Sequence, residues 1–388
     1  MNQKKILFIL GLAGFIVMAD NWVVSPILPA IAGDLGSNVA RASLIISAYM
    51  IPFGLFQLVF GYLADRFGKR QVISFSMIFF TISTALCAIA AGITDLAVYR
   101  ALTGVFAASV MPVSLALIGD LFPMNERQSA IGTFMGISFL GQGLSMAIGG
   151  AIAFFLNWRG VFIIYSLLSL IPTVLLFTVV KEFPSTKNPD SKMFAPYLTL
   201  LKNPSSSMIY LLVLLEGIFL IGSFSFLGGF IAKQFSFNNF LIGLIMTAFG
   251  IMAVVGGRVS GKISARIGKK RTIITGLLLA VAANALFTTI GTTLAFVIIG
   301  IGLMGLGFML AHSTFLTIAT EFAAKARGVA MSLVAFCFMG GGGLGTALGS
   351  RIVGSSGMNT LFTVYGLGLV VVISGVLLNK RSFMSENK

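Results

Sequence analysis

Four ionisable side chains lie inside long apolar stretches of this sequence: Asp20, Arg100, Glu216 and His312. Hydrocarbon solvates an ionisable group poorly, so each of them must face a partner or a water-filled space. Carboxylates and imidazoles in such places are candidates for binding a proton or a cationic ligand. A purely structural role, as a buried ion pair or a histidine packed in a core, is the alternative for each.

Depth along the predicted helices brings two of these groups together. Asp20 lies 14 residues after Ile6, about 21 Å along a helix and about 9 Å short of the far boundary of a ~30 Å hydrocarbon core. Arg100 lies five residues into a stretch that runs the other way, about 8 Å below the same boundary. The matching depths predict an ion pair between Asp20 and Arg100.

Glu216 is a different case, because no Lys, Arg or His lies near it in the sequence. It sits about eight residues into its stretch, roughly 12 Å in and close to the bilayer centre. Desolvation there favours the neutral carboxyl, which makes Glu216 a candidate proton or cation site. The alternative is a hydroxyl or backbone partner. His312 is the one histidine of the chain, and both a proton role and a structural role are open for it.

The composition indicates what surrounds these groups. The chain has 388 residues, of which 57% are hydrophobic and 10% charged, with a mean hydropathy of +1.02. A water-soluble domain cannot cover that much apolar surface. About 20 apolar residues span a bilayer, and the sequence offers twelve such segments. They lie at roughly 6–30, 42–63, 72–93, 95–118, 128–152, 160–180, 208–232, 239–260, 272–292, 294–318, 327–350 and 359–379. We therefore expect an all-α integral membrane protein.

The net charge of +15 follows from topology. With the N-terminus inside, 21 of the 26 Lys and Arg residues fall on the inner side, and the exceptions are Arg41, Arg100, Arg159, Lys233 and Arg351. Inner basic residues orient membrane proteins, so we expect a multi-pass protein of the cell membrane with both termini cytoplasmic, and no nucleic-acid partner. The first stretch carries Asp20 and lacks a cleavage site, which predicts an uncleaved helix.

A basic turn between two spans occurs twice. Gly61-Tyr-Leu-Ala-Asp65-Arg66-Phe-Gly68-Lys69-Arg70 is repeated as Gly261-Lys-Ile-Ser-Ala265-Arg266-Ile-Gly268-Lys269-Lys270, 200 residues later. Gly141 and Gly149 recur at the same offset as Gly341 and Gly349. The duplication predicts two six-helix halves, 1–180 and 208–388, joined by the hydrophilic cytoplasmic linker 181–207.

The first turn resembles the loop between helices 2 and 3 of the major facilitator superfamily, G-x-L-a-D-r-x-G-r-k. The resemblance implies two pseudo-symmetric six-helix bundles with a midplane cavity lined by helices 1, 4, 7 and 10, and Glu216 would belong to that cavity. Arg100-Ala-Leu-Thr103-Gly104 is similar to the fourth-helix pattern R-x-x-Q-G, with Thr103 in place of Gln. In proton-driven exporters of the superfamily that arginine is implicated in proton handling.

The fifth helix carries a further resemblance. Gly141-Gln-Gly-Leu-Ser145-Met146-Ala-Ile-Gly149-Gly150 is similar to G-x-x-x-G-P-x-x-G-G of the drug:proton antiporters, and departs from it at Ser145 and Met146. We expect Gly141, Gly149 and Gly150, together with Gly104 of the fourth helix, to let helices pack closely.

At the cytoplasmic rim the resemblance places Asp120 beside Arg66 and Arg70. It places Asp65 at the N-terminus of the eleventh helix, near Arg327, where a carboxylate is stabilised by about 0.3–1 kcal/mol. We call this contact between Asp65 and the eleventh helix the rim latch. Because Ala265 takes the place of Asp65 in the second turn, we expect one rim latch and not two. The alternative is a turn that merely obeys the positive-inside rule.

These features favour a monomeric, proton-coupled secondary transporter that exports amphiphilic or cationic small molecules by alternating access. Its partners would be its substrate, protons and the lipid bilayer, with the proton gradient as energy source in place of a cofactor. No metal-ligand cluster, nucleophile elbow or phosphate loop appears in the sequence, so an enzyme is not expected. The alternatives are an exporter or flippase for a specific metabolite, sugar or lipid, or a channel or non-transporting receptor.

Overall fold

The computed structural model describes residues 3–122, 124–179, 195–289, 291, 293–322 and 327–379, and within these ranges the ordered elements are all helices. Eleven helical segments of the described residues are long and apolar enough to cross a bilayer. The last of them, Val329–Leu378, has 50 residues, about 75 Å of helix and more than twice the hydrocarbon thickness. Gly357 divides it, at a φ of 84° that favours glycine. The chain therefore makes the twelve passes predicted from the sequence.

The described residues of the first half form nine helices. They are α1 (Gln3–Trp22), α2 (Val24–Asp34), α3 (Val39–Ala42), α4 (Leu44–Phe67), α5 (Lys69–Ala88), α6 (Ile93–Ala107), α7 (Val110–Leu121), α8 (Met124–Phe155) and α9 (Trp158–Thr178).

The second half begins with a short helix that falls inside the predicted linker. Its elements are α10 (Ala195–Lys202), α11 (Pro204–Glu216), the π-helical turn η2 (Gly217–Ile221), α12 (Gly222–Phe224), α13 (Leu227–Phe235), α14 (Asn239–Ile267), α15 (Lys269–Thr289), α16 (Leu294–Phe322) and α17 (Arg327–Leu378). The earlier part of the linker, 181–194, lies outside the described residues.

Prolines explain two breaks that the predicted spans did not contain. The first helix was expected to end near Pro26 and Pro29, but α1 stops at Trp22 and α2 continues to Asp34. Pro26 has no N–H for the carbonyl of Trp22, and it is tolerated within the first turn of a new helix. The fourth span breaks in the same way between α6 and α7, where Pro112 leaves the carbonyl of Ala108 without its helical partner.

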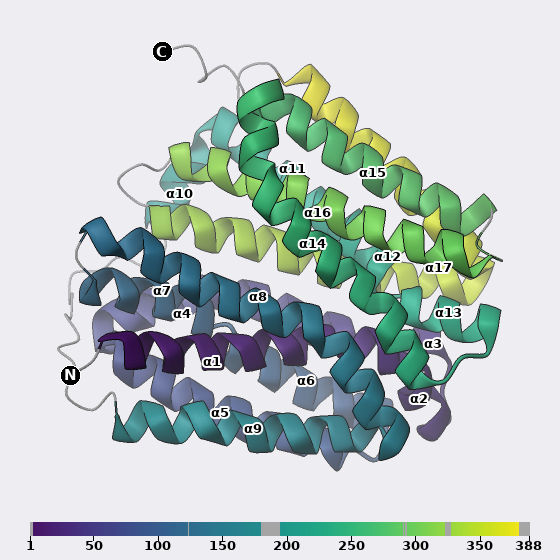
Figure 1. The fold of residues 1–388 in the computed structure, drawn as a ribbon, viewed down its shortest axis with the longest axis horizontal. Helices are drawn as coiled ribbons and strands as arrows, with labels where there is room; N and C mark the ends of the chain where they lie inside the picture. Colours follow the sequence, from purple (N-terminus) through teal and green to yellow (C-terminus); the bar gives the residue numbers. More distant parts are fainter. Residues whose placement is uncertain are drawn as a thin grey trace.

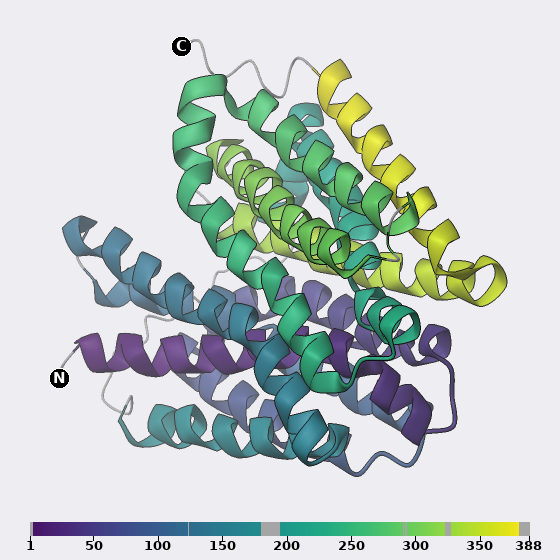
Figure 2. The same cartoon turned by 45° about the vertical axis from the view of Figure 1, so that its right-hand side comes forward.

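The two halves pack side by side, with the first half below and the second above in Figure 1. We call the end that holds the turns at Gly68 and Gly268 the basic end, and the end that holds Asp34 and Trp158 the opposite end. Helix α1 begins and α17 ends at the basic end (Figures 1 and 2), as an even number of passes requires.

Glycines let the halves approach at two related interfaces, α8 against α14 and α4 against α17. Gly143 lies on the backbone of Gly250, and Gly54 lies on the backbone of Gly340. At the 200-residue offset, the contact of Gly143 with Gly250 corresponds to that of Gly343 with the Met50–Ile51 segment. The duplication seen in the sequence is therefore repeated in how the halves meet.

The four glycines singled out in the sequence all lie at close contacts. Gly104 faces the backbone of Tyr49, Gly141 the backbone of Phe15, Gly149 the side chain of Val23, and Gly150 the backbone of Asn239. The first three contacts are within the first half. The contact of Gly150 is between the halves, where α8 meets α14.

Candidate functional site

Asp20 and Arg100 form a salt bridge inside the first half. Asp20 lies in the last turn of α1, and Arg100 lies in α6, which runs the other way. Arg100 donates from Nη1 to Asp20 Oδ2 at 2.7 Å and from Nη2 to the backbone oxygen of Asp20 at 3.3 Å. The two residues are 0% and 1% exposed. The helical depths counted from the sequence thus led to the right partner.

The surroundings of this pair are aromatic and tightly closed. The guanidinium of Arg100 lies 4.1 Å from the ring centroid of Tyr49 and 5.7 Å from that of Phe162. Asp20 Oδ1 and Arg100 Nε have no hydrogen-bond partner among the described residues. Arginine keeps its proton in proteins, so this pair holds a permanent positive charge against a carboxylate in a buried site.

Glu216 and His312, by contrast, are brought together from two spans of the second half. Glu216 ends α11, and His312 lies in α16. The distance from Glu216 Oε2 to His312 Nδ1 is 3.2 Å. The carboxylate is 0% exposed and its Oε1 has no partner within the described chain, whereas the imidazole side chain is 17% exposed. This pairing was not predicted from the sequence, in which 96 residues separate the two partners.

A π-helical turn follows Glu216 directly. The turn η2 begins at Gly217, whose Cα lies against the carbonyl of Phe338 and the amide of Gly342 on α17. A side chain at position 217 would not fit at this distance. The close approach presses the end of α11 against α17, and π-helical turns occur frequently at functional sites.

Aromatic rings connect the imidazole to the contact between the halves. The His312 ring lies 4.1 Å from that of Phe338 and 5.3 Å from that of Phe308. Phe308 stacks on Phe249 at 5.7 Å, and Phe249 on Trp22 at 5.5 Å. The second-half pair therefore borders a continuous aromatic wall that reaches helix α1 of the first half.

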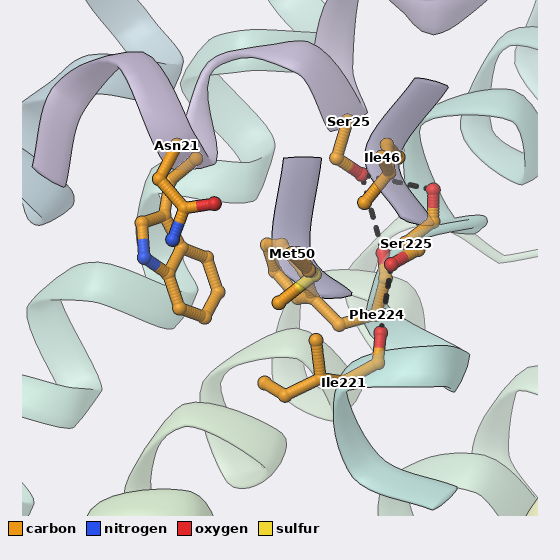
Figure 3. Close-up of a pocket in the computed structure, with 8 residues that line it drawn as sticks. Asn21, Ser25, Ile46, Met50, Ile221, Phe224 and Ser225 are labelled. Atoms are coloured by element: carbon orange, nitrogen blue, oxygen red, sulfur yellow. Dashed lines mark hydrogen bonds between the residues drawn. The ribbon is translucent and has the colours of Figure 1, made fainter. Parts of the chain in front are cut away.

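The halves are closed against each other beyond this wall (Figure 3). Ser25 Oγ of α2 lies 3.2 Å from the carbonyl oxygen of Phe224 and 3.1 Å from that of Ser225. Ser25 and Ser225 are equivalent at the 200-residue offset, so they meet at the pseudo-twofold axis. The pocket beside them, which Asn21 and Met50 help to line, has a volume of about 20 Å³, room for about one water molecule. As far as the described residues show, the contact between the halves around Ser25 and Ser225 leaves no space for a substrate.

At the basic end, lysines bind the carboxylates of the fourth span in both halves. Lys69 donates to Asp120 Oδ2 at 2.8 Å and lies 3.9 Å from Asp65 Oδ1. In the second half Lys269 bridges to Glu321 at 2.9 Å. The expected neighbours of Asp120 were Arg66 and Arg70, whereas the salt bridge that the structure gives it comes from Lys69. The second turn has Ala265 where the first has Asp65, and its Lys269 binds the carboxylate of Glu321 on α16.

The expected contact of Asp65 with the eleventh helix falls near Arg327, whose side chain lies outside the described residues. A different link between the halves lies close by. Tyr197 of α10 donates to the carbonyl of Leu58 on α4 at 3.3 Å, and α10 also packs against α17. Its hydroxyl lies 3.8 Å from the point that a Cβ of Gly61 would occupy. Tyr197 was not recognised from the sequence.

Comparison with known protein families fits this architecture. The family model described as Major Facilitator Superfamily matches residues 10–346, and a second match covers 209–387. The chain belongs to the major facilitator superfamily. It is accordingly a multi-pass membrane transporter and not an enzyme, and the two overlapping matches agree with a duplicated chain.

Several curated relatives are members of the superfamily. The multidrug transporter protein MdtP of Bacillus subtilis (strain 168) is 27% identical, over 92% of this chain and 77% of its own. The tetracenomycin C resistance and export protein of Streptomyces glaucescens is 25% identical, over 86% of this chain and 72% of its own. An uncharacterised transporter of Bacillus subtilis (strain 168), YceJ, is 30% identical over 68% of each chain.

Solved structures of superfamily transporters share the fold. A bacterial homologue of the human lysosomal transporter Spinster, in an inward-facing and unoccupied conformation, superposes with a TM-score of 0.82 and 19% identity, over 99% of this chain and 98% of its own. The nucleoside transporter NupG, as a D323A mutant, gives a TM-score of 0.80 and 15% identity, over 97% and 99%. Both ionisable pairs lie on the first and fourth spans of their halves, Asp20 and Arg100 on α1 and α6 and Glu216 and His312 on α11 and α16.

Proposed function

We propose that this chain is a proton-coupled exporter of amphiphilic or cationic small molecules, which works by alternating access in the cell membrane with both termini in the cytoplasm. The observation that carries the proposal is the pair formed by Glu216 and His312. It joins a fully buried carboxylate to a partly exposed imidazole at 3.2 Å. Intramembrane ionisable residues of this kind mark proton relays in transporters.

Coupling follows from competition at Glu216. Protonation of Glu216 gives the neutral carboxyl, which its buried site favours. A bound cationic substrate favours the ionised carboxylate instead. Binding of one therefore promotes release of the other, and the proton gradient drives the substrate outward when the two leave on opposite sides. His312 is the group through which a proton reaches Glu216, because its imidazole is both in contact with the carboxylate and partly exposed.

Two observations support the proposed substrate class: the aromatic rings beside His312 and the substrates named for related transporters. Rings of Phe308 and Phe338 flank the imidazole, and aromatic faces attract organic cations and flat apolar groups. Relatives named for multidrug transport and for tetracenomycin C export support an amphiphilic substrate.

A second candidate is an exporter or flippase for one metabolite, sugar or lipid. It is favoured by Ser145 and Met146, which replace the Gly and Pro of the drug-exporter pattern on the fifth span. Transport assays with dyes, sugars and lipids in the same proteoliposomes separate the candidates, since a multidrug exporter moves several unrelated amphiphiles and a specific one does not.

Transport by Glu216→Gln tests the mechanism. The purified variant is reconstituted in liposomes with an imposed pH difference, and substrate movement against its own gradient is measured. We expect uphill transport to be abolished, with some downhill movement of neutral substrates retained, because glutamine fixes the neutral state at nearly constant shape. The matched control is Glu321→Gln, the same change at a carboxylate bound to Lys269 at the basic end, which should leave uphill transport intact.

Two outcomes would count against the proposal. Normal uphill transport by Glu216→Gln would remove this residue from the mechanism and leave Asp20 with Arg100 as the remaining proton site. Transport by the native protein that is indifferent to the pH difference would reject proton coupling itself.

A further inference from the structure

An apolar groove lies on the outside of the first half, away from both ionisable pairs. It is formed by α4, α5 and α6, has a volume of about 520 Å³, and is lined mainly by phenylalanines, among them Phe67, Phe75, Phe79 and Phe106. Its volume is within the range of small-molecule sites. Phe67, Phe75 and Phe79 are 55%, 57% and 47% exposed, so the groove opens toward the surrounding lipid and not toward the centre of the molecule.

The length of the groove matches one leaflet of a bilayer. Its lining begins beside the basic turn, at Phe67, and extends along α5 to Phe79. Phe79 lies ten residues after Lys69, where α5 begins, which is about 15 Å along the helix and half of the ~30 Å hydrocarbon core. A straight acyl chain that starts at the membrane surface spans the same depth.

An arginine stands at the surface end of the groove. Arg66 donates to the hydroxyl of Tyr62 at 2.5 Å, and its guanidinium lies 6.0 Å from the ring centroid of Phe67, a groove residue. Among the described residues, no carboxylate lies within salt-bridge distance of Arg66, whereas neighbouring Lys69 is bound to Asp120 and Asp65. Within the described part of the chain, the positive charge at the mouth therefore lacks a counter-ion.

A polar atom inside the groove also lacks a partner. Gln71 lines it one turn beyond Phe67, and its Oε1 is buried without a hydrogen bond within the described chain. A buried acceptor left unpaired is costly. At this depth, just below the surface, a bound lipid places its glycerol and headgroup, and a headgroup hydroxyl is the donor that the amide oxygen needs.

We propose that this groove binds a single anionic phospholipid from the leaflet at the basic end. One acyl chain lies along the phenylalanines, the phosphate contacts Arg66, and a headgroup hydroxyl donates to Gln71. The planar guanidinium binds phosphate through two parallel hydrogen bonds. The site is independent of the proposed transport mechanism, because neither ionisable pair contributes to it.

Fluorescence quenching by brominated lipid tests the site on the full-length protein. Phe75→Trp places a reporter in the groove, and the protein is reconstituted in vesicles that contain brominated phosphatidylglycerol or brominated phosphatidylcholine. We expect the groove to prefer phosphatidylglycerol about fivefold, the gain that one basic residue provides at an anionic surface. Arg66→Gln in the same reporter background should bring the preference to about one.

The second half supplies both controls. Leu278→Trp puts a reporter at a 52% exposed position of α15, the helix equivalent to α5, where quenching should not distinguish the lipids. Arg266→Gln, at the equivalent position of the second turn, should leave the preference at Phe75→Trp unchanged. Phe79→Trp is a second reporter should Phe75→Trp fold poorly.

The possible results divide clearly. A preference at the groove reporters that disappears with Arg66→Gln supports the site. Equal quenching by both lipids, no quenching by either, or a preference of the same size at Leu278→Trp overturns it. Equal quenching would mean that the groove accepts any lipid, and no quenching would mean that it is closed to lipid. An equal preference at Leu278→Trp would mean that anionic lipid is enriched all around the protein.

Discussion

Each half of the chain carries a carboxylate on its first span and a cationic or titratable partner on its fourth, but the two pairs lie at different depths. At the 200-residue offset Asp20 corresponds to Leu220, and Arg100 to Gly300. Glu216 lies four residues before the first of these positions and His312 twelve after the second, about 6 and 18 Å along their helices. Both displacements are toward the basic end, because α11 runs away from that end and α16 runs toward it.

The partners differ in chemistry as well as in depth. Arginine cannot release its proton under physiological conditions, whereas histidine changes charge near neutral pH. The arginine pair is 0% and 1% exposed, whereas the imidazole is 17% exposed. One half therefore holds a permanent charge pair in a closed site, and the other holds a titratable pair whose imidazole is partly exposed. The first suits a structural fastener, and the second a coupling site.

The largest expected difference between the pairs is in stability. Arg100→Ala leaves Asp20 as a buried carboxylate without a counter-ion, and we expect the free energy of unfolding in mild detergent to fall by about 3–5 kcal/mol. Glu216→Gln, which leaves no buried charge, should cost less than about 1.5 kcal/mol. Denaturant unfolding of the two variants measures the difference, and equal losses would contradict the assignment of Asp20 and Arg100 as the fastener.

A smaller effect on stability, but a specific one on transport, is expected at the second pair. His312→Gln retains an amide that can hydrogen-bond to Glu216, so we expect unfolding to change by about 1 kcal/mol or less. The dependence of uphill transport on pH should change in shape, because glutamine cannot pass a proton on to Glu216. Arg100→Lys is the comparison, since it should lower stability and keep the shape of the pH profile. An unchanged profile in His312→Gln would leave the histidine a structural role.

The smallest effect is expected at an exposed ion pair that serves as a reference for both. At the opposite end, Arg159 and Trp158 donate to Asp34, and these hydrogen bonds lower the pKa of its carboxyl from the usual value of about 3.9. A lowered pKa stabilises the folded state above the ordinary value, and that stability is lost as the pH falls through the lowered one. Melting temperatures between about pH 2 and 7 should show a slight acid-side decline that Asp34→Asn lacks. A decline of the same size in Asp34→Asn would exclude this pair as its source.

Much of the fold could be read from the sequence, because hydrophobic length and the repeated turn are local signals. The spans and the offset of 200 residues needed no knowledge of tertiary contacts. The pairing of Asp20 with Arg100 was also within reach, since counting residues along two antiparallel helices is enough to compare their depths.

The remaining features of the site depend on contacts that sequence spacing does not encode. The meeting of Glu216 with His312 requires knowing how α11 and α16 are rotated about their own axes. Tyr197 was missed because its hydrogen bond joins α10 to Leu58 of the first half, 139 residues earlier in the chain. The groove beside Arg66 was missed because phenylalanines that line a hollow look the same in sequence as those that simply face lipid.

The glycine contact between α8 and α14 has a consequence for motion. Where Gly143 lies on Gly250, the two helices present bare backbone to each other. Where side chains of two helices interdigitate, one helix can move past the other only if the packed side chains separate. Their rotamers must also change during that movement. Two glycines in contact have no side chains that must separate or change rotamer. We therefore expect that one half can rotate relative to the other at this contact while the side chains around it keep their conformations.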